Sequence, residues 1–218
     1  MTTTAPTTPA ATAQDLLLLL LEDGRRRGLP SRTLETVIGG ALLLDLLATG
    51  HLEFAADGVL AYRRRVVATG AEPGEDLRRR AVRLVTGPTG AGLPAVTAVE
   101  RLGSALSGAV LDRLAAAGVA EHRRERVLGL LRRDRWVLTH PARARAVRER
   151  LRAVLTGAAD PTPQDAVALT VLAESGRGFP LDGLGWSARR GAVAAARELT
   201  AAVPGRAALR VAVLAAAG

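Results

Sequence analysis

Few residues of this sequence have the types and spacing that catalysis or metal binding requires. The three histidines, His51, His122 and His140, lie far apart and have no metal-ligand spacing around them. Cysteine is absent, which excludes disulfides, thiolate metal sites and cysteine nucleophiles. The Gly-x-Ser-x-Gly pattern of a serine nucleophile is also absent. We therefore predict a protein that is not an enzyme and that uses no metal or cofactor.

The glycine-rich segment Gly87–Gly92 resembles a phosphate-binding loop only in its glycine content. A P-loop requires Lys and then Ser or Thr after its last glycine, whereas Leu93 and Pro94 follow here. We interpret the segment as a flexible connector. The acidic residues fall at expected helix caps, in loops or beside arginines, and no spacing among them indicates a pair of catalytic carboxylates.

Arginine is the residue type most informative about function. All 30 basic residues are arginine, and the net charge of +9 indicates an anionic partner, either nucleic acid or an acidic membrane surface. Exclusive use of arginine is also typical of a GC-rich genome, in which arginine replaces lysine on an ordinary solvated surface. The clusters are spread along the chain, which predicts a basic surface rather than one pocket. They are Arg25–Arg27, Arg63–Arg65, Arg78–Arg80, Arg123–Arg126, Arg132–Arg135 and Arg143–Arg152.

A basic nucleic-acid-binding or regulatory scaffold is the alternative reading of this charge. Hairpins and neighbouring helices arranged as a winged helix could contact DNA phosphates. No expected helix combines Arg with Asn or Gln to read bases, however, and an aromatic content of 2% leaves no stacking platform for single strands. The sequence therefore favours the membrane surface over nucleic acid as the anionic partner.

Composition predicts a mainly α-helical protein with a single multi-helix domain. Of the 218 residues, 48% are hydrophobic, and with so few aromatics the core must be built from Leu, Val and Ala, which favours helices. Residues 1–13 are rich in Thr, Pro and Ala, so we expect a disordered tail before one domain over 14–218. The N-terminus lacks positive charge and the apolar runs are short. We expect neither a signal peptide nor a membrane-spanning segment.

Two helix starts carry the spacing of a capping box. Thr12–Asp15 precedes the leucine run Leu16–Leu21, which predicts a buried helix that Gly24 can end. Thr162–Asp165 has the same spacing and predicts a helix over Ala166–Glu174.

The second helix is expected to form the centre of the core. Ser31 or Thr33 can cap it, and it runs to Thr49 with Gly50 after it. Its segment Val37–Leu47 is apolar on nearly every face, and a helix with this pattern in a globular protein is surrounded by other elements.

One or two β-hairpins complete the expected fold. Apolar residues alternate on either side of Asp57-Gly58, which predicts a hairpin of Leu52–Phe54 with Val59–Val67. The arginine-dense segment His122–Leu138 has weak helical periodicity and predicts a protruding hairpin or loop. In the helix that begins at Asp76, the arginines from Arg78 onward are expected to point mostly outward. The other expected elements are helices over Asp76–Val85, Ala95–Ala117 (with a possible break at Gly103) and Ala142–Leu155, two helices after Ser187 and Pro204, and a loop over Gly87–Pro94.

The order of these patterns resembles the Golgi phosphoprotein 3 family over roughly residues 14 to 200. The resemblance rests on Asp15–Leu19, on Gly40–Leu52, on Thr69-Gly70 before an acidic-apolar helix start, and on Leu111–Val119 before the charged segment. It implies one helical domain around a hydrophobic helix, an adaptor role, and a basic surface that binds phosphatidylinositol 4-phosphate in the eukaryotic members. It also implies that His122–Leu138 is a hairpin for self-association, with Arg124, Val127, Leu130, Leu131 and Trp136 as its contact residues.

The residues that bind the headgroup in the family are replaced here. Their positions correspond to Pro30, Gly39, Ser104 and Ser107, so none of the four side chains is kept. Nearby arginines could form a displaced anion site, for which we select Arg27, Arg32, Arg101 and Ser104. The basic N-terminal tail that serves cargo binding in the family is replaced by neutral Thr and Pro.

We therefore expect a cytoplasmic protein that is peripheral to the inner face of the membrane and binds anionic phospholipid, with a phosphoinositide-like headgroup, through an arginine-rich surface. Further expected partners are a second copy of the chain and a protein cargo. Nucleic acid is the less favoured partner.

Overall fold

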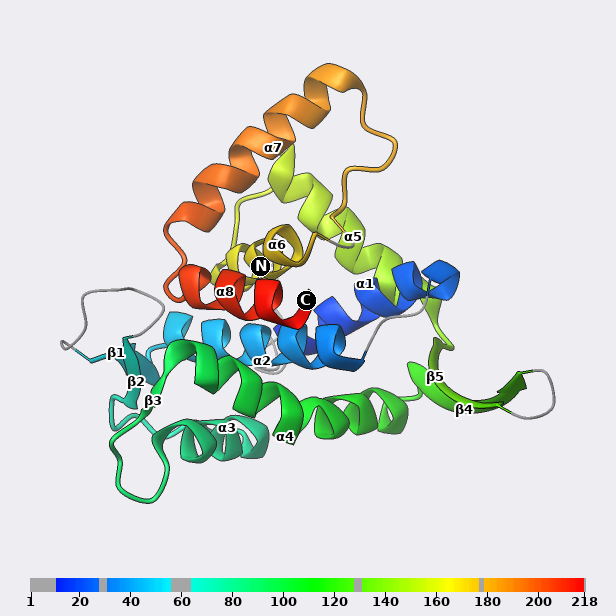
Figure 1. Cartoon of the computed structure of the whole chain (residues 1–218). Helices are drawn as coiled ribbons and strands as arrows, with labels where there is room; N and C mark the ends of the chain where they lie inside the picture. The colour runs from blue at the N-terminus through cyan, green and yellow to red at the C-terminus, as the bar shows by residue number, and fades with distance from the viewer. Residues whose placement is uncertain (1–10, 28–30, 56–63, 128–130, 177–178, 218) are drawn as a thin grey trace.

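The computed structural model of the chain describes residues 11–27, 31–55, 64–127, 131–176 and 179–217. This part of the chain forms eight helices and two small antiparallel sheets (Figure 1), which confirms the predicted mainly α-helical class. The helices are α1 (Ala11–Arg27), α2 (Ser31–Ala48), α3 (Asp76–Thr86), α4 (Ala95–Ala116), α5 (Pro141–Leu155), α6 (Pro163–Ser175), α7 (Trp186–Ala201) and α8 (Arg206–Ala217). The strands are β1 (Leu52–Phe54), β2 (Arg65–Ala68), β3 (Leu93–Pro94), β4 (Ala120–Val127) and β5 (Leu131–Leu138).

Helix α2 lies at the centre of the core, as its pattern predicted. Every residue from Thr36 to Leu47 is buried, because α1, α4, α6 and α8 pack around the helix (Figure 1). The leucine run Leu16–Leu21 of α1 is also fully or nearly buried. A helix that is apolar all round is stable only when other elements cover each of its faces. The two most hydrophobic stretches of the sequence thus form the middle of the molecule.

The contact between α2 and α4 depends on two glycines. A Cβ atom at Gly39 would lie 2.0 Å from the carbonyl oxygen of Val99, and one at Gly103 would lie 2.2 Å from the carbonyl oxygen of Glu35. Only glycine lets two helix backbones approach so closely. Helix α4 therefore continues through Gly103, where the sequence allowed a break, because the glycine serves packing and not termination.

The first sheet has three strands, one more than the sequence predicted. Strand β2 pairs antiparallel with β1, with Leu52 opposite Ala68, and also with β3, where Val66 is opposite Leu93. Part of the expected loop over Gly87–Pro94 is therefore a strand. Two residues are too short a run to show alternation, so the pairing arises from tertiary contact. The expected turn at Asp57-Gly58 lies outside the described residues.

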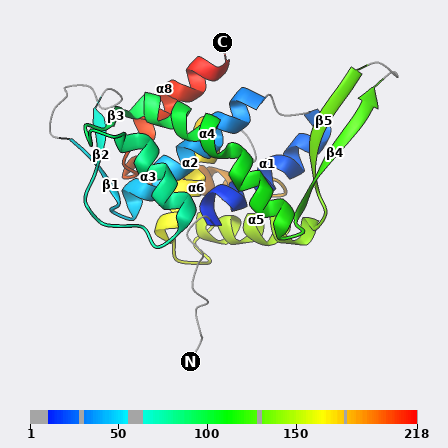
Figure 2. The same cartoon turned by 90° about the horizontal axis from the view of Figure 1, so that it is seen from below.

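The second sheet is the hairpin of β4 and β5, which confirms the expected hairpin over His122–Leu138. Its register runs from Ala120 opposite Leu138 to Val127 opposite Leu131. Within the described residues it contacts the body chiefly through α1 and α4, and the strands project away from the helices (Figure 2). An isolated two-stranded hairpin is marginally stable in water, so these contacts must support it.

Helix α1 differs from its prediction at both ends. It already includes Ala11, and it continues through Gly24 to Arg27. Thr12 therefore lies inside the helix, and its buried hydroxyl has no hydrogen-bond partner in the part of the chain that the structure describes. Asp15 pairs instead with Arg150 of α5. The second capping box, Thr162–Asp165, is formed as predicted.

The glycine contact can be tested within a single helix. Gly103→Ala places a methyl group against the backbone of α2, and we expect it to lower the free energy of unfolding by about 1–3 kcal/mol, the usual cost of overpacking. Gly108→Ala is the matched control on α4, because a Cβ there meets nothing within 4 Å. The control should be neutral or stabilising by roughly 0.5–1 kcal/mol, since alanine is the better helix former. Equal stabilities of the two variants in chemical denaturation would contradict the contact.

Candidate functional site

A surface pocket with a volume of about 460 Å³ opens where α2, α4 and α8 meet. It lies beside the glycine contact, which fixes the distance between the first two of these helices. Residues three or four positions apart lie on one face of a helix, so each helix offers a short stripe to the pocket. The lining is Arg32, Glu35 and Thr36 of α2, Thr97, Glu100, Arg101 and Ser104 of α4, and Ala212, Ala215 and Ala216 of α8.

The structure brings together three of the four residues selected from sequence as an anion site. Arg32, Arg101 and Ser104 all line this pocket, although they come from two helices far apart in the sequence. Arg27 is the last residue of α1, and its side chain lies outside the described atoms, as does all of Pro30. Gly39 lies in the helix contact, where no larger side chain fits.

The pocket also holds acidic residues that sequence reasoning did not select. Glu35 and Glu100 stand beside the two arginines, and within the described residues none of the four forms an ion pair. Helical periodicity could have found both, since Glu35 lies one turn after Arg32 and Glu100 one turn before Ser104. The alanine wall of α8 could not be found in this way, because it comes from the far end of the chain.

Two of the hydroxyl groups in the pocket donate to nearby backbone carbonyls and leave their oxygens as acceptors. The Thr36 hydroxyl donates to the carbonyl oxygen of Arg32 at 2.9 Å, and the Ser104 hydroxyl donates to that of Arg101 at 3.3 Å. A ligand in the pocket therefore meets guanidinium donors, carboxylate acceptors and hydroxyl oxygens on an exposed surface. This set of donors and acceptors suits the binding of a small polar group.

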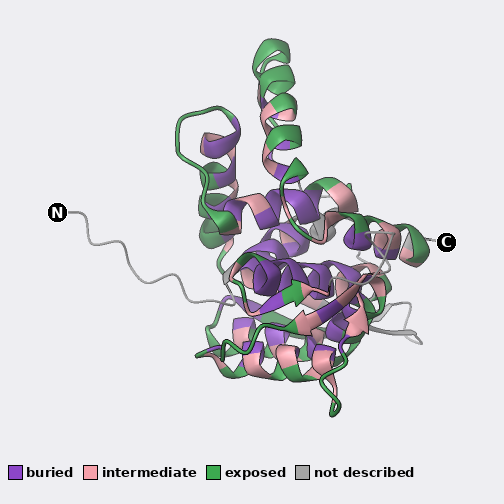
Figure 3. Ribbon diagram, turned by 90° about the vertical axis from the view of Figure 1, so that its left-hand side faces the viewer, coloured by how far each residue is buried: buried purple, intermediate pink, exposed green. Residues whose placement is uncertain are grey.

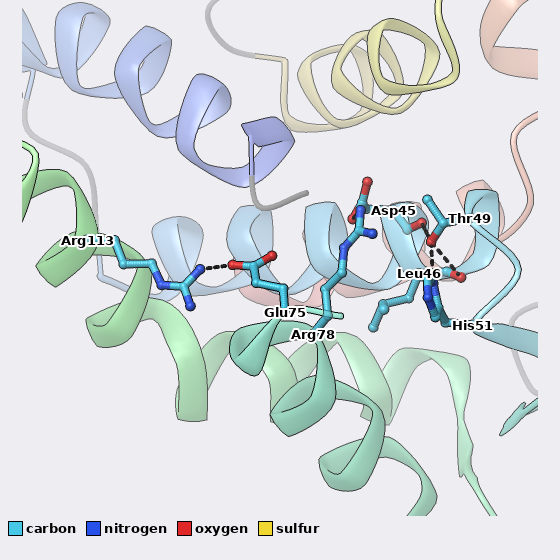
Figure 4. A network of polar contacts seen from close by, with 7 residues as sticks. All are labelled: Asp45, Leu46, Thr49, His51, Glu75, Arg78 and Arg113. Atoms are coloured by element: carbon cyan, nitrogen blue, oxygen red, sulfur yellow. Dashed lines mark hydrogen bonds and ion pairs between the residues drawn. The ribbon is translucent and has the colours of Figure 1, made fainter. Parts of the chain in front are cut away.

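A second polar cluster is buried and joins α2 to α3 (Figure 4). Arg78 forms an ion pair with Asp45 at 2.5 Å, and their side chains are 9% and 6% exposed. Arg78 was expected to point mostly outward, and that expectation is wrong. It faces inward because Asp45 is the one acidic residue on the buried surface of α2. Burial raises the pKa of Asp45 above its ordinary value, although Arg78 acts in the opposite direction.

The same region contains two further polar contacts that hold the ends of elements (Figure 4). Glu75, at the start of α3, pairs with Arg113 of α4, and the hydroxyl of Thr49 lies 2.8 Å from Nδ1 of His51. Burial lowers the pKa of His51, and the positive charge of Arg78 lowers it further. With the Asp45 carboxylate so little exposed, a substrate cannot reach it. We interpret the cluster as a structural connection between helices.

Arg150 makes the corresponding connection on the other side of the core. Its guanidinium lies 3.4 Å from a carboxylate oxygen of Asp15 and 2.8 Å from one of Asp165, which links α1, α5 and α6. Burial raises the pKa of Asp15, with the Arg150 charge opposing it. Both carboxylates are almost completely enclosed, at 10% and 2% side-chain exposure, so this pair also belongs to the fold.

The exposed surface of α7 carries a separate basic patch. Trp186 is 74% exposed, and the guanidinium of Arg190 lies 4.8 Å from its ring centroid. Arg189 and Arg197 line the same shallow hollow. The part of α7 that rises above the body is exposed along most of its surface (Figure 3).

The predicted self-association residues fall on the β4–β5 hairpin. Trp136 is half-buried and its ring packs against His122 at a centroid distance of 5.1 Å. Arg124, Val127 and Leu131 lie on the strands with side chains outside the described atoms, and Leu130 lies in the segment that the structure does not describe. The hairpin itself is present as a projecting element.

No metal site or membrane-spanning helix emerges from the part of the chain that the structure describes. Its residues contain no group of three His, Asp or Glu side chains that could hold a metal ion. No single helix there is long and apolar enough to cross a bilayer, while α7 and α8 meet the length and composition criteria only as a pair, bent by 110°.

These features define a mainly α-helical protein built around one apolar helix, with a polar pocket on its surface. The chain belongs to the Golgi phosphoprotein 3 (GPP34) family, whose family model matches residues 13–216, nearly the whole chain. The match confirms the family resemblance seen in the sequence. Among the curated proteins, none matches the chain. Membership in this family fits an adaptor-type role and not an enzymatic one.

The buried ion pair gives a stability prediction with a defined pH dependence. Arg78→Met leaves Asp45 buried without its guanidinium partner, and we expect it to lower the free energy of unfolding at about pH 7 by about 3–5 kcal/mol. Loss of Arg78 raises the already elevated pKa of Asp45 further. A raised carboxyl pKa contributes stability at low pH that is lost as the pH rises through the folded-state pKa. The deficit of the variant should therefore shrink on acidification.

Chemical denaturation at several pH values between about 4 and 8 measures this deficit across the range in which buried carboxyls titrate. The double variant Asp45→Leu with Arg78→Met removes both charges and should recover most of the loss, since a buried pair replaced by apolar groups is often neutral. A deficit that is constant with pH, or a double variant as unstable as the single one, would contradict the proposed role of the pair.

Proposed function

We propose that the protein is a non-enzymatic adaptor that attaches to the membrane surface by binding anionic phospholipid headgroups in the pocket of α2, α4 and α8. The observation that carries the proposal is the convergence of Arg32 and Arg101 on one open pocket. Neither guanidinium has an ion-pair partner among the described residues, so both are available to a ligand. Guanidinium groups bind phosphate with two parallel hydrogen bonds, which orients the ligand as well as attracting it.

The size and surroundings of the pocket support a headgroup as the ligand. A volume of about 460 Å³ lies within the ordinary range for small-molecule sites. Leu214, on the same turn of α8 as Ala212 and Ala215, is 66% exposed and can enter the apolar edge of a bilayer. The net charge of +9 draws the protein toward an acidic membrane leaflet at long range. The cytoplasmic face of a membrane supplies such a leaflet, and an adaptor there would recruit protein cargo.

Nucleic acid remains the alternative partner, and the exposed arginines of α7 are the surface that favours it. The pocket does not, because Glu35 and Glu100 would repel a polyphosphate backbone laid across it. A lipid headgroup is small enough to use the arginines selectively. The lipid proposal depends on the arginines of the pocket, whereas nucleic-acid binding would depend on those of α7.

Vesicle flotation of two double variants tests the lipid proposal. Each variant removes two positive charges, one from the pocket and the other from α7. Arg32→Ala with Arg101→Ala should weaken binding to acidic vesicles by roughly 30-fold, because each arginine near the surface contributes about 1 kcal/mol. Arg189→Ala with Arg190→Ala, on α7, is the matched control and should weaken it by less than about threefold. Circular dichroism should show both variants folded, since all four side chains are exposed.

A DNA-shift assay with the same two variants separates the alternatives. Binding to DNA without vesicle binding, or equal losses from the pocket variant and the α7 variant, would refute a lipid site in the pocket.

We also propose that the β4–β5 hairpin mediates self-association. Its two strands form a sheet of their own and project from the body (Figure 2), so each strand has an edge that pairs with no other described strand, and such edges readily pair with another chain. Trp136→Glu introduces a charge into this hairpin and should shift the oligomeric state toward monomer in sedimentation analysis. Trp186→Glu alters the only other tryptophan, on α7, and should leave the state unchanged. Wild type that is monomeric at high concentration would refute the proposal.

A further inference from the structure

The pocket of α2, α4 and α8 is unusual in holding unpaired charges of both signs. Arg32 and Arg101 contribute two positive charges, and Glu35 and Glu100 contribute two negative charges. The four groups share one small surface, yet within the described residues no ion pair joins any of them. A pocket made for a purely anionic ligand would not place two carboxylates beside the bound phosphate, because like charges repel at this range.

From this arrangement we infer that the pocket takes a phospholipid headgroup that carries an ammonium group beside its anionic groups, as phosphatidylserine does. The inference rests on the proposed lipid function of the same pocket. The arginines bind the phosphate and carboxylate of the headgroup, and Glu35 and Glu100 bind its ammonium group. Each charged group of the ligand then faces an opposite charge in the protein, and the two carboxylates share the single ammonium group.

The neutral side chains of the pocket fit the same ligand. An ammonium group has three hydrogen-bond donors and needs acceptors around it. Because the hydroxyls of Thr36 and Ser104 donate to backbone carbonyls, their oxygens are left to accept from the ligand. Ala212, Ala215 and Ala216 form the third wall with small side chains, which leaves room for a branched headgroup. Both α2 and α4 thus offer the ligand guanidinium donors together with carboxylate and hydroxyl oxygens.

Two vesicle types of equal charge test the inference. Phosphatidylserine and phosphatidylglycerol each carry one net negative charge, and only the first has an ammonium group. In flotation with phosphatidylcholine vesicles doped with equal fractions of one or the other, the wild type should bind the phosphatidylserine vesicles about tenfold more tightly, as expected for a charge-assisted contact that only one lipid can make. Equal binding of the two vesicle types by the wild type would overturn the inference.

The variant Glu35→Gln with Glu100→Gln tests whether the carboxylates cause the preference. Glutamine keeps the shape of the side chain and removes the charge, so the ratio of the two affinities should fall to about one. Glu53→Gln with Glu198→Gln is the matched control, since both residues are exposed and neither lines the pocket. The control adds the same positive charge and should raise binding to both vesicle types equally, with the ratio unchanged. A pocket variant that keeps the wild-type ratio would overturn the inference.

The Arg32→Ala and Arg101→Ala double variant separates failure of this inference from failure of the proposed function. If that variant binds both vesicle types as well as the wild type does, the pocket is not a lipid site and both proposals fail. If it loses binding to both vesicle types while Glu35→Gln with Glu100→Gln leaves the ratio unchanged, the pocket binds lipid without recognising an ammonium group, and only the headgroup inference fails.

Discussion

The direct backbone contact between α2 and α4 is the constraint on which the rest of the structure depends. With hydrogen in place of a side chain at Gly39 and Gly103, the two longest helices meet at a distance that no other residue permits. Helix α2 can then be covered on all sides, because α4 lies close enough to leave its other faces to α1, α6 and α8. The hydrophobic core therefore follows from a contact that contains no side chain.

Buried ion pairs connect the outer helices to the apolar core. The pair of Asp45 with Arg78 connects α3 to the central helix, and Arg150 bridges Asp15 and Asp165. Such pairs add little net stability compared with apolar packing, but loss of one partner is costly, so they select one arrangement of the outer helices. None of these paired residues lines the pocket, and of its charged residues Arg32, Glu100 and Arg101 are exposed to solvent while Glu35 is half-buried.

The helices, the central position of α2, the long hairpin and three lining residues of the pocket could be predicted from the sequence, because each has a local pattern of residue spacing. It was wrong where a tertiary contact overrode the local signal. Arg78 points inward because it forms an ion pair with Asp45 of another helix. Gly24 does not end α1, which continues to Arg27. Strand β3 exists only because β2 lies beside it. The alanines of α8 that line the pocket likewise show no local sequence pattern, because their role depends on the residues of α2 and α4 opposite them.

The glycine contact also separates the shape of the pocket from its chemistry. The distance between the two charged walls is fixed by main-chain atoms, so exchanging Arg32, Glu100 or Ser104 for other residues alters the chemistry of the pocket without moving the walls. Substitutions in this lining are therefore nearly independent of folding, and natural selection can vary them one at a time. The frame thus lets the lining of the pocket vary while the architecture stays constant.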